Sequence, residues 1–293
     1  MFRNLMLIVN PYSGRGLSKS ALGTVVAQLG ANGYATTVYL IGKHSAEELV
    51  CEFSKNYDLC VCIGGDGTIS GVVSGLLSAG ITIPVGYIPA GTSNDVATTL
   101  DLPKEPVAAA QKIINGSPVA LDIGSFDGRN FIYIAAFGAF TDVAYSTPQT
   151  AKRSLGHLAY VFSGIAGMGA ITAQRTVIEL DGNVIEDEFI FGGVLNSTSV
   201  AGFLKLDPEY VDLSDGLFEV ILVKQPLSLQ EFLGILGSIR NRSYSGDNVQ
   251  LLQAKRVKFT FDTEVAWTID GEDGGAHKQV EIQNLHKAVR IIV

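Results

Sequence analysis

Three short segments of the chain carry residue types that suit phosphate chemistry. They span residues 10–14, 64–68 and 89–97, and they are rich in Gly, Ser, Thr, Asn and Asp. Glycine lets the backbone approach a phosphate closely, and the N–H groups at the start of a helix attract anions. Within the second segment, Asp66 is a candidate for holding a divalent cation or a hydroxyl group. Each segment by itself also has a simpler explanation as an ordinary turn or helix cap, and for residues 10–14 alone this explanation is favoured.

The elements around these segments alternate between strands and helices. Residues 59–63 form an unbroken apolar run, which is typical of a strand buried on both faces of a parallel sheet. The predicted strands are 5–9, 36–41, 59–63 and 83–88, and the predicted helices are 18–31, 45–55, a stretch ending near 78, and 106–115. A capping box, Ser45 to Glu48, opens the second helix. Because the carboxyl ends of parallel strands share one edge of a sheet, we expect the three segments to meet there.

The pattern changes near residues 116–118 and becomes strand-rich. A second capping box, Ser228 to Glu231, opens a helix to about residue 241, and another helix is expected around 156–173. We therefore predict an α/β fold class, in which a parallel-sheet nucleotide-binding domain (1–118) precedes a β-rich, antiparallel domain (119–293) whose last strand returns towards the first. The strands expected in the second domain are 119–123, 131–136, 176–180, 189–195, 218–223, 257–261, 265–269, 280–282 and 289–293.

Composition excludes several classes of function. The 293 residues include only 17% charged and as much as 47% hydrophobic residues, which argues against disorder. A formal net charge of −8 argues against bulk binding to nucleic acid or to an anionic membrane. Cys51, Cys60 and Cys62 are best explained as reduced thiols, and no signal-peptide pattern opens the chain, so we expect a cytoplasmic protein. The long uncharged span between Arg153 and Arg175 predicts a buried or cleft-lining helix and not a transmembrane segment.

The order and spacing of the three segments resemble a known family. Neither a Walker-type loop nor the protein-kinase motifs are present. Instead, Asn10-Pro-x-Ser-Gly14, Gly64-Gly-Asp-Gly-Thr68 and Pro89-x-Gly-Thr-x-Asn-Asp-x-Ala97 resemble the diacylglycerol kinase catalytic domain family of soluble bacterial lipid kinases, which is related to sphingosine and ceramide kinases. The resemblance continues through residues 155–160, 215–217 and 270–272. It implies ATP in a cleft between two domains and a lipid hydroxyl as acceptor.

The resemblance also implies roles for individual residues. Asp270 is favoured as the general base, Glu272 is its close rival, and Asp66 is expected near the catalytic Mg²⁺ or the acceptor hydroxyl. Without the resemblance, the Asp-Gly pair at 270–271 predicts only a hairpin turn. The residues expected to contact the ATP phosphates are Asn10, Pro11, Tyr12, Ser13, Gly14, Gly64, Gly65, Asp66, Gly67, Thr68, Gly91, Thr92 and Asn94.

A structural Mg²⁺ site is implied for residues 212–217. Its ligands are expected to be the main-chain carbonyls of Asp212 and Leu217 and the side chain of Asp215, since Mg²⁺ prefers oxygen ligands. An Asp-Gly surface turn explains the same residues equally well. One departure from the family pattern is Gly71, where many members have glutamate, so that a carboxylate near the cation or phosphates is expected to be missing.

The function expected from these features is that of an ATP-dependent, Mg²⁺-requiring kinase acting on diacylglycerol or a similar lipid at the inner membrane face. An NAD kinase-like enzyme shares the glycine turn, although the segment 89–97 favours the lipid enzymes. A nucleotide- or lipid-binding regulator with weak or no turnover is kept open by Gly71. A homodimer is also kept open, and nucleic acid is not expected as a partner. The aromatic residues Phe131, Tyr133, Phe137, Phe140 and Tyr145 are candidates for an apolar lipid groove, although such residues more often form a core.

Overall fold

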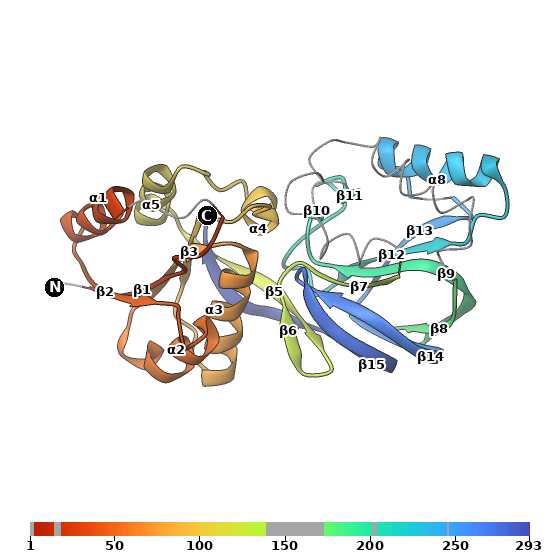
Figure 1. Cartoon of the computed structure of the whole chain (residues 1–293), viewed down its shortest axis with the longest axis horizontal. Coiled ribbons are helices and arrows are strands. Elements are labelled where there is room, and N and C mark those ends of the chain that lie inside the picture. Colours follow the sequence, from red (N-terminus) through yellow and green to blue (C-terminus); the bar gives the residue numbers. More distant parts are fainter. Residues whose placement is uncertain (1–2, 15–18, 139–172, 201–203, 245) are drawn as a thin grey trace. The chain divides into compact units, whose positions relative to one another are not determined.

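The computed structural model describes residues 3–14, 19–138, 173–200, 204–244 and 246–293 (Figure 1). Contacts divide these residues into two compact units. The first unit contains the described residues up to Ile123 together with His286–Val293, and the second contains those of Gly124–Leu285. The division falls within strand β5 (Pro118–Phe126), just after the boundary expected at residue 118, and within strand β15 (Glu272–Ile292).

The strands of the first unit place the three phosphate-type segments. Strand β1 (Arg3–Val9) pairs in parallel with β2 (Tyr34–Leu40) and with β3 (Leu59–Gly64). Strand β3 pairs in parallel with β4 (Val85–Pro89), and Ile291 of β15 pairs with Val85 of β4. Every residue of β3 is buried, as its unbroken apolar run predicts. The described segments therefore follow strands that run in the same direction.

Helices cover both faces of this sheet (Figure 1). Helices α1 (Lys19–Ala31) and α5 (Pro106–Asn115) lie on one face, where their apolar residues join those of the strands in one buried cluster. On the other face, α2 (Ala46–Phe53) packs against α3 (Asp66–Ala79). The predicted capping box of α2 is confirmed. The unit also contains a 3-10 turn, Ser54–Asn56, and the short helix α4, Asp95–Thr99.

The second unit is built from antiparallel strands. Its hydrogen-bonded strands follow one another in the order β13, β12, β9, β7, β14 and β15. Strand β8 pairs with both β9 and β14, and a short hairpin joins β5 to β6. The mixed α/β class with a β-rich second part is thus confirmed. The strands are β6 (Arg129–Phe131), β7 (Ile134–Gly138), β8 (Gln174–Leu180), β9 (Asn183–Leu195), β10 (Ser199–Val200), β11 (Leu204–Lys205), β12 (Phe218–Lys224), β13 (Val249–Ala254), β14 (Arg256–Ile269) and β15.

The strand boundaries differ from the predicted ones where apolar patterning is weak. The runs 257–261 and 265–269 form one strand, β14, because its pairing with β15 absorbs a register shift between Thr260 and Val265. Strand β13 was not predicted, since its sequence alternates poorly. Helix α8 (Leu229–Asn241) begins at the predicted cap, where the Ser228 side chain accepts from the Glu231 N–H. The helix expected around 156–173 and the aromatic residues Phe140 and Tyr145 lie outside the described residues.

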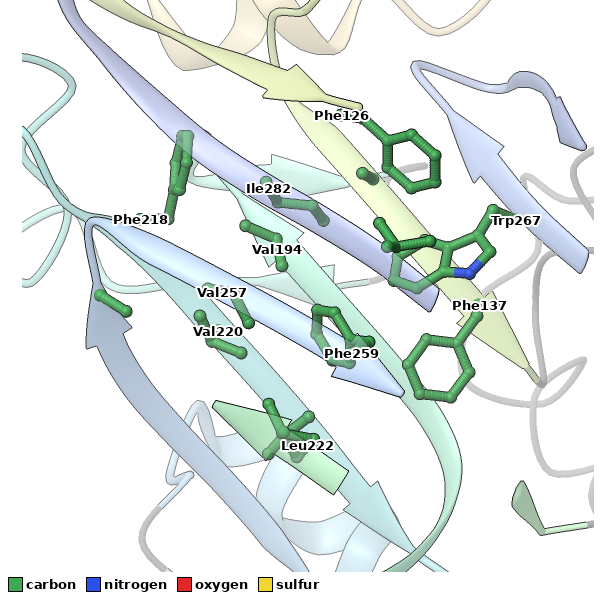
Figure 2. Close-up of a cluster of buried hydrophobic side chains, with 14 of the residues drawn as sticks. Phe126, Phe137, Val194, Phe218, Val220, Leu222, Val257, Phe259, Trp267 and Ile282 are labelled. Atoms are coloured by element: carbon green, nitrogen blue, oxygen red, sulfur yellow. The ribbon is translucent and has the colours of Figure 1, made fainter. Parts of the chain in front are cut away.

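An aromatic core fills the second unit (Figure 2). The ring of Trp267 lies 5.0 Å from that of Phe137 and 5.1 Å from that of Phe126, and Figure 2 shows these rings beside Phe259. Phe131 is fully buried in the same cluster. Phe131 and Phe137 are therefore core residues, the commoner of the two interpretations, and do not line a groove, because both rings are enclosed by the unit's own side chains.

Glu219 is a buried carboxylate in this unit. It is 1% exposed on β12, and its Oε1 accepts from Gln253 Nε2 at 3.2 Å, while its Oε2 has no partner among the described residues. Burial raises the pKa of Glu219 from 4.5 to about 7, with smaller contributions in the same direction from the charges of Asp215 and Asp212. The folded state favours the neutral form of Glu219. Its contribution to the free energy of unfolding is therefore complete below the unfolded pKa of 4.5 and is lost as pH rises through the folded pKa of about 7.

We therefore expect Glu219→Gln to be more stable than the native protein at pH 8, by up to about 3 kcal/mol, and to match it near pH 5. Melting temperatures measured across this pH range test the prediction. Glu264→Gln, at an exposed position of β14, is the control and should leave the pH dependence unchanged. Equal pH profiles for the native protein and Glu219→Gln would contradict the assignment.

Candidate phosphate-binding site

Three loops meet at the carboxyl ends of β1, β3 and β4. The Asn10 N–H donates to the Ile63 carbonyl at 2.9 Å, and the Ala90 N–H donates to the Gly64 carbonyl at 2.7 Å. A Cβ atom added to Gly91 would lie 2.5 Å from the Gly65 Cα atom. These loops are therefore in backbone contact, and the contact requires glycine.

Side chains of the first loop hold the second. Asn10 Nδ2 donates to Thr68 Oγ1 at 3.2 Å, and Ser13 Oγ accepts from the Gly65 N–H at 3.3 Å. Pro11 and Tyr12 are exposed, and Tyr12 contributes only its N–H, which donates to Asn10 Oδ1 at 3.0 Å. Asn10 and Ser13 thus organise the loops, whereas the Tyr12 side chain extends into solvent.

The start of α3 offers donors for an anion. Gly65 is its N-cap residue and supplies no side chain to bond the first-turn N–H groups. Helix starts leave such groups without intrahelical partners, and the helix dipole makes them favourable for negative charge. Gly67 lies in this first turn and is exposed. The Thr68 N–H already donates to the Gly65 carbonyl at 2.9 Å, and the glycine-rich turn is a candidate for phosphate binding.

Asp66 has a structural partner that the sequence did not reveal. Its carboxylate accepts from the N–H groups of Asp95 and Val96, each at 3.1 Å, and so caps α4 from across the loops. Burial raises the pKa of Asp66 above its usual value, and the Val96 and Asp95 N–H groups oppose this effect without cancelling it. The Asp66 side chain therefore links the second loop to the third through these two hydrogen bonds.

The third loop closes on itself through Asn94. Asn94 Oδ1 accepts from the Gly91 N–H and its Nδ2 donates to the Gly91 carbonyl, both at 2.9 Å. Asn94 is 8% exposed and has a φ of 53°, a left-handed conformation that asparagine tolerates. The Gly91 N–H was expected as a phosphate donor, but in this structure Asn94 accepts it. Thr92 is exposed at the tip of the loop.

Tyr87 on β4 was missed because a tyrosine in an apolar strand predicts only core packing. Its ring is 1% exposed, and its hydroxyl donates towards the Gly64 carbonyl at 3.3 Å and Asn94 Oδ1 at 3.4 Å. Burial raises the pKa of Tyr87 far above its usual range, with smaller contributions from the charges of Asp66, Cys62 and Asp95. The phenol therefore stays protonated beneath the loops, where its one proton is shared between these two acceptors.

Asp270 lies in the second unit at a hairpin turn. Asp270 and Gly271 have φ values of 49° and 79° between the paired residues Ile269 and Glu272, so the predicted turn is confirmed. The Asp270 carboxylate is 6% exposed and accepts from the N–H groups of Ile132 at 2.8 Å, Tyr133 at 3.0 Å and Ile134 at 3.2 Å.

Glu272, the rival of Asp270, has a different environment. It is exposed and forms an ion pair of 3.4 Å with Arg129. The surroundings of the two candidate bases therefore differ. The Asp270 carboxylate is buried and accepts from three backbone N–H groups, whereas the Glu272 carboxylate is exposed and pairs with the exposed side chain of Arg129.

The expected Mg²⁺ loop forms polar turns. Asp212 Oδ1 accepts from the N–H of Ser214 at 2.9 Å, and Asp215 Oδ1 accepts from the N–H of Leu217 at 2.8 Å. Among the described residues, no group of three or more His, Cys, Asp and Glu is placed to hold a metal ion. These hydrogen bonds agree with the interpretation of residues 212–217 as an Asp-Gly surface turn, and the metal site stays a proposal.

Comparisons with known proteins decide the family. A profile described as the diacylglycerol kinase catalytic domain matches residues 4–126, and one described as the YegS C-terminal NAD kinase beta sandwich-like domain matches residues 136–293. A Bacillus subtilis (strain 168) protein named diacylglycerol kinase is 33% identical over 98% of this chain and 95% of its own length. The chain belongs to the diacylglycerol kinase family. A Staphylococcus aureus (strain JH9) diacylglycerol kinase is 34% identical over 94% of this chain and 88% of its own.

Solved structures agree with this membership of the diacylglycerol kinase family. A crystal structure from Bacillus anthracis str. Sterne, assigned as a diacylglycerol kinase, superposes with a TM-score of 0.83 at 26% identity. It covers 99% of this chain, and this chain covers 97% of it. In the parts of the chain that the structure describes, no helix is both long and apolar enough to span a membrane.

Gly71, where the chain departs from the pattern of the diacylglycerol kinase family, packs between helices. A Cβ atom added there would lie 3.1 Å from the Ala46 Cβ atom and 3.5 Å from the Glu47 nitrogen, both in α2. We therefore expect Gly71→Glu to lower the free energy of unfolding by about 1–3 kcal/mol, because the larger side chain must push α2 away. Turnover should not rise.

Chemical denaturation and kinase assays of Gly71→Glu check this expectation. Gly23→Glu is the matched control, because none of the described residues has an atom within 4 Å of a Cβ atom at that exposed position of α1. A Gly71→Glu protein of native stability and increased turnover would show instead that the site lacks a carboxylate.

Proposed function

We propose that this protein transfers the γ-phosphoryl group of ATP to a hydroxyl of diacylglycerol or a similar lipid. The observation that carries the proposal is the convergence of three glycine-containing loops on the uncapped start of α3, in a chain of the diacylglycerol kinase family. Phosphoryl transfer depends mainly on positioning and on stabilising negative charge, which such loops supply.

The phosphates are assigned to the first unit. In this proposal they contact the first-turn N–H groups of α3, with Thr92 at the tip of the third loop. Asn10, Ser13 and Asn94 keep the loops in register through the hydrogen bonds described above. Asp66 would lie near the catalytic Mg²⁺, one of the two positions that the family resemblance implies, the other being near the acceptor hydroxyl.

The acceptor proton is assigned to Asp270. The lipid oxygen forms a bond to the γ-phosphorus as the bond to the β-phosphate oxygen breaks, ADP leaves, and the carboxylate takes the hydroxyl proton. Three N–H groups hold the Asp270 carboxylate in one orientation. Phosphoryl transfer depends mainly on positioning and charge neutralisation, so the base has only to take the hydroxyl proton as the bond forms. Its fixed orientation favours it over Glu272.

Mg²⁺ is proposed at the turn formed by residues 212–217. Oxygen ligands suit this ion. Glu219 follows Leu217 by two residues, and its Oε2 has no partner among the described residues. The charges of Asp212 and Asp215 make its surroundings negative. The Asp212 and Leu217 carbonyls and the Asp215 side chain would hold the ion, which would offset this negative charge. We expect Mg²⁺ to raise the melting temperature of the native protein and to raise that of Asp215→Asn less. An equal rise in both proteins would remove this assignment, and Asp247→Asn serves as an exposed control.

The lipid acceptor places the reaction at a membrane surface, and we propose that the protein is cytoplasmic and associates transiently with the inner membrane face. The deciding experiment incubates pure protein with labelled ATP, Mg²⁺ and mixed micelles of candidate lipids, with NAD in a parallel reaction. A labelled lipid is the expected product. Labelled NAD without labelled lipid would overturn the proposal, and ATP binding without transfer to any acceptor would indicate a regulator.

A further inference from the structure

The hydroxyl of Tyr87 lies where two phosphate-type loops meet. Its partners are the last carbonyl of β3, at Gly64, and the side chain of Asn94 in the third loop, at 3.3 Å and 3.4 Å. The Gly64 carbonyl also accepts from the Ala90 N–H at 2.7 Å. A carbonyl oxygen has two lone pairs, so the phenol and the strand ladder together satisfy this buried acceptor.

The Asn94 amide lies beside the same hydroxyl. The Gly91 backbone selects its orientation, because Oδ1 accepts from the Gly91 N–H and Nδ2 donates to the Gly91 carbonyl. In this orientation Oδ1 also faces the Tyr87 hydroxyl, whose one proton is shared with the Gly64 carbonyl. Tyr87 thereby supports the left-handed conformation of Asn94, which is 8% exposed.

The orientation of this loop determines how closely it approaches the glycine turn. Gly91 lies so near Gly65 that an added Cβ atom would be 2.5 Å from the Gly65 Cα atom. A hydrogen bond that spans both loops from below opposes their separation. A preformed site also binds its ligand without the loss of loop entropy that a loose site must overcome.

We propose that Tyr87 is a positioning residue of the phosphate site, whose hydroxyl holds the third loop against the glycine turn before the nucleotide arrives. This inference rests on the proposed function, because it assumes that the loops bind the phosphates of ATP. It assigns Tyr87 an effect on nucleotide affinity and none on the phosphoryl-transfer step, since the side chain is 1% exposed and its hydroxyl bonds to Gly64 and Asn94 beneath the loops.

The test compares Tyr87→Phe with Tyr244→Phe in the full chain. Tyr244 is also buried, and its hydroxyl donates to the Lys205 carbonyl at 2.8 Å in the second unit, so each variant removes a bond from the hydroxyl of a buried tyrosine to a carbonyl. Calorimetric titration with ATP should give a Kd roughly 3- to 10-fold higher for Tyr87→Phe, equivalent to one hydrogen bond. Its kcat at saturating ATP should match that of the native protein. Tyr244→Phe should keep the native Kd, even though its melting temperature falls.

Equal ATP affinity in native protein and Tyr87→Phe would overturn the inference, as would an equal loss of affinity in both variants. Failure of the native protein to bind ATP would refute the proposed function itself. Hydrogen exchange of the native protein is a second measurement, independent of any variant. Slow exchange of the Ala90, Gly91 and Asp95 amides without nucleotide is expected, because these N–H groups have acceptors, and fast exchange that slows only after ATP is added would also overturn the inference.

Discussion

Replacing Asp270 with asparagine is expected to lower kcat by roughly 100- to 10,000-fold, the usual contribution of a general base. Affinity for ATP should stay close to the native value, because a base acts in the transition state. The structure adds a second consequence. Asparagine has one acceptor oxygen where the carboxylate has two, so a buried N–H group from residues 132–134 loses its partner. We expect the variant to lose about 1–3 kcal/mol of stability.

Single-turnover assays, ATP titration and thermal melting together test this prediction. Melting curves show whether the variant is folded at the assay temperature, so that a loss of turnover is not confused with unfolding. Glu272→Gln is the matched control, because it removes only the exposed ion pair with Arg129 and should cost less than about 1 kcal/mol. Near-native turnover in Asp270→Asn and a large loss in Glu272→Gln would transfer the role of base to Glu272.

Gly91→Ala is expected to have the second large effect. The added methyl group would lie 2.5 Å from Gly65 Cα and 2.9 Å from Asn94 Oδ1, so the third loop must move away from the glycine turn. A displacement of about 1 Å in a catalytic site lowers kcat/KM by roughly 100-fold. We also expect a loss of stability of about 1–3 kcal/mol, as is typical of overpacking.

Kinase assays at varied ATP concentration, together with denaturant unfolding, measure both effects of Gly91→Ala. Gly23→Ala is the control, since a Cβ atom at that position in α1 would have no neighbour within 4 Å in the described parts of the chain. There the same substitution should stabilise the protein by about 0.5–1 kcal/mol and leave activity unchanged. Native kcat/KM in Gly91→Ala would show that the contact between the two loops is not needed for nucleotide binding.

Local features of the fold were predictable from sequence. The Ser45–Glu48 capping box depends on residues three positions apart, and the buried strand 59–63 is an unbroken apolar run. The Asp-Gly hairpin at 270–271 follows from turn chemistry alone. Strand β13 was missed because its apolar residues do not alternate, and its pairing with β12 depends on tertiary contacts.

The roles of site residues were only partly predictable. Motif order and spacing identified the family, because the segments keep their sequence positions whatever their partners. The partners themselves depend on folding, since Asp66 caps a helix that begins 29 residues later and Asp270 accepts from an N–H group 138 residues earlier. No sequence pattern distinguishes Tyr87 from a core tyrosine.

The sequence by itself determined that this protein has glycine-rich loops after consecutive strands and a family-specific set of motifs, since these depend on residue type and local spacing. Only the tertiary structure decided which donors and acceptors are already paired. Asn94 accepts the Gly91 N–H, Asp66 caps α4, and Gly71 packs against α2. The physical reason is that a hydrogen bond or a close packing contact depends on where distant segments meet, and sequence spacing alone does not contain that geometry.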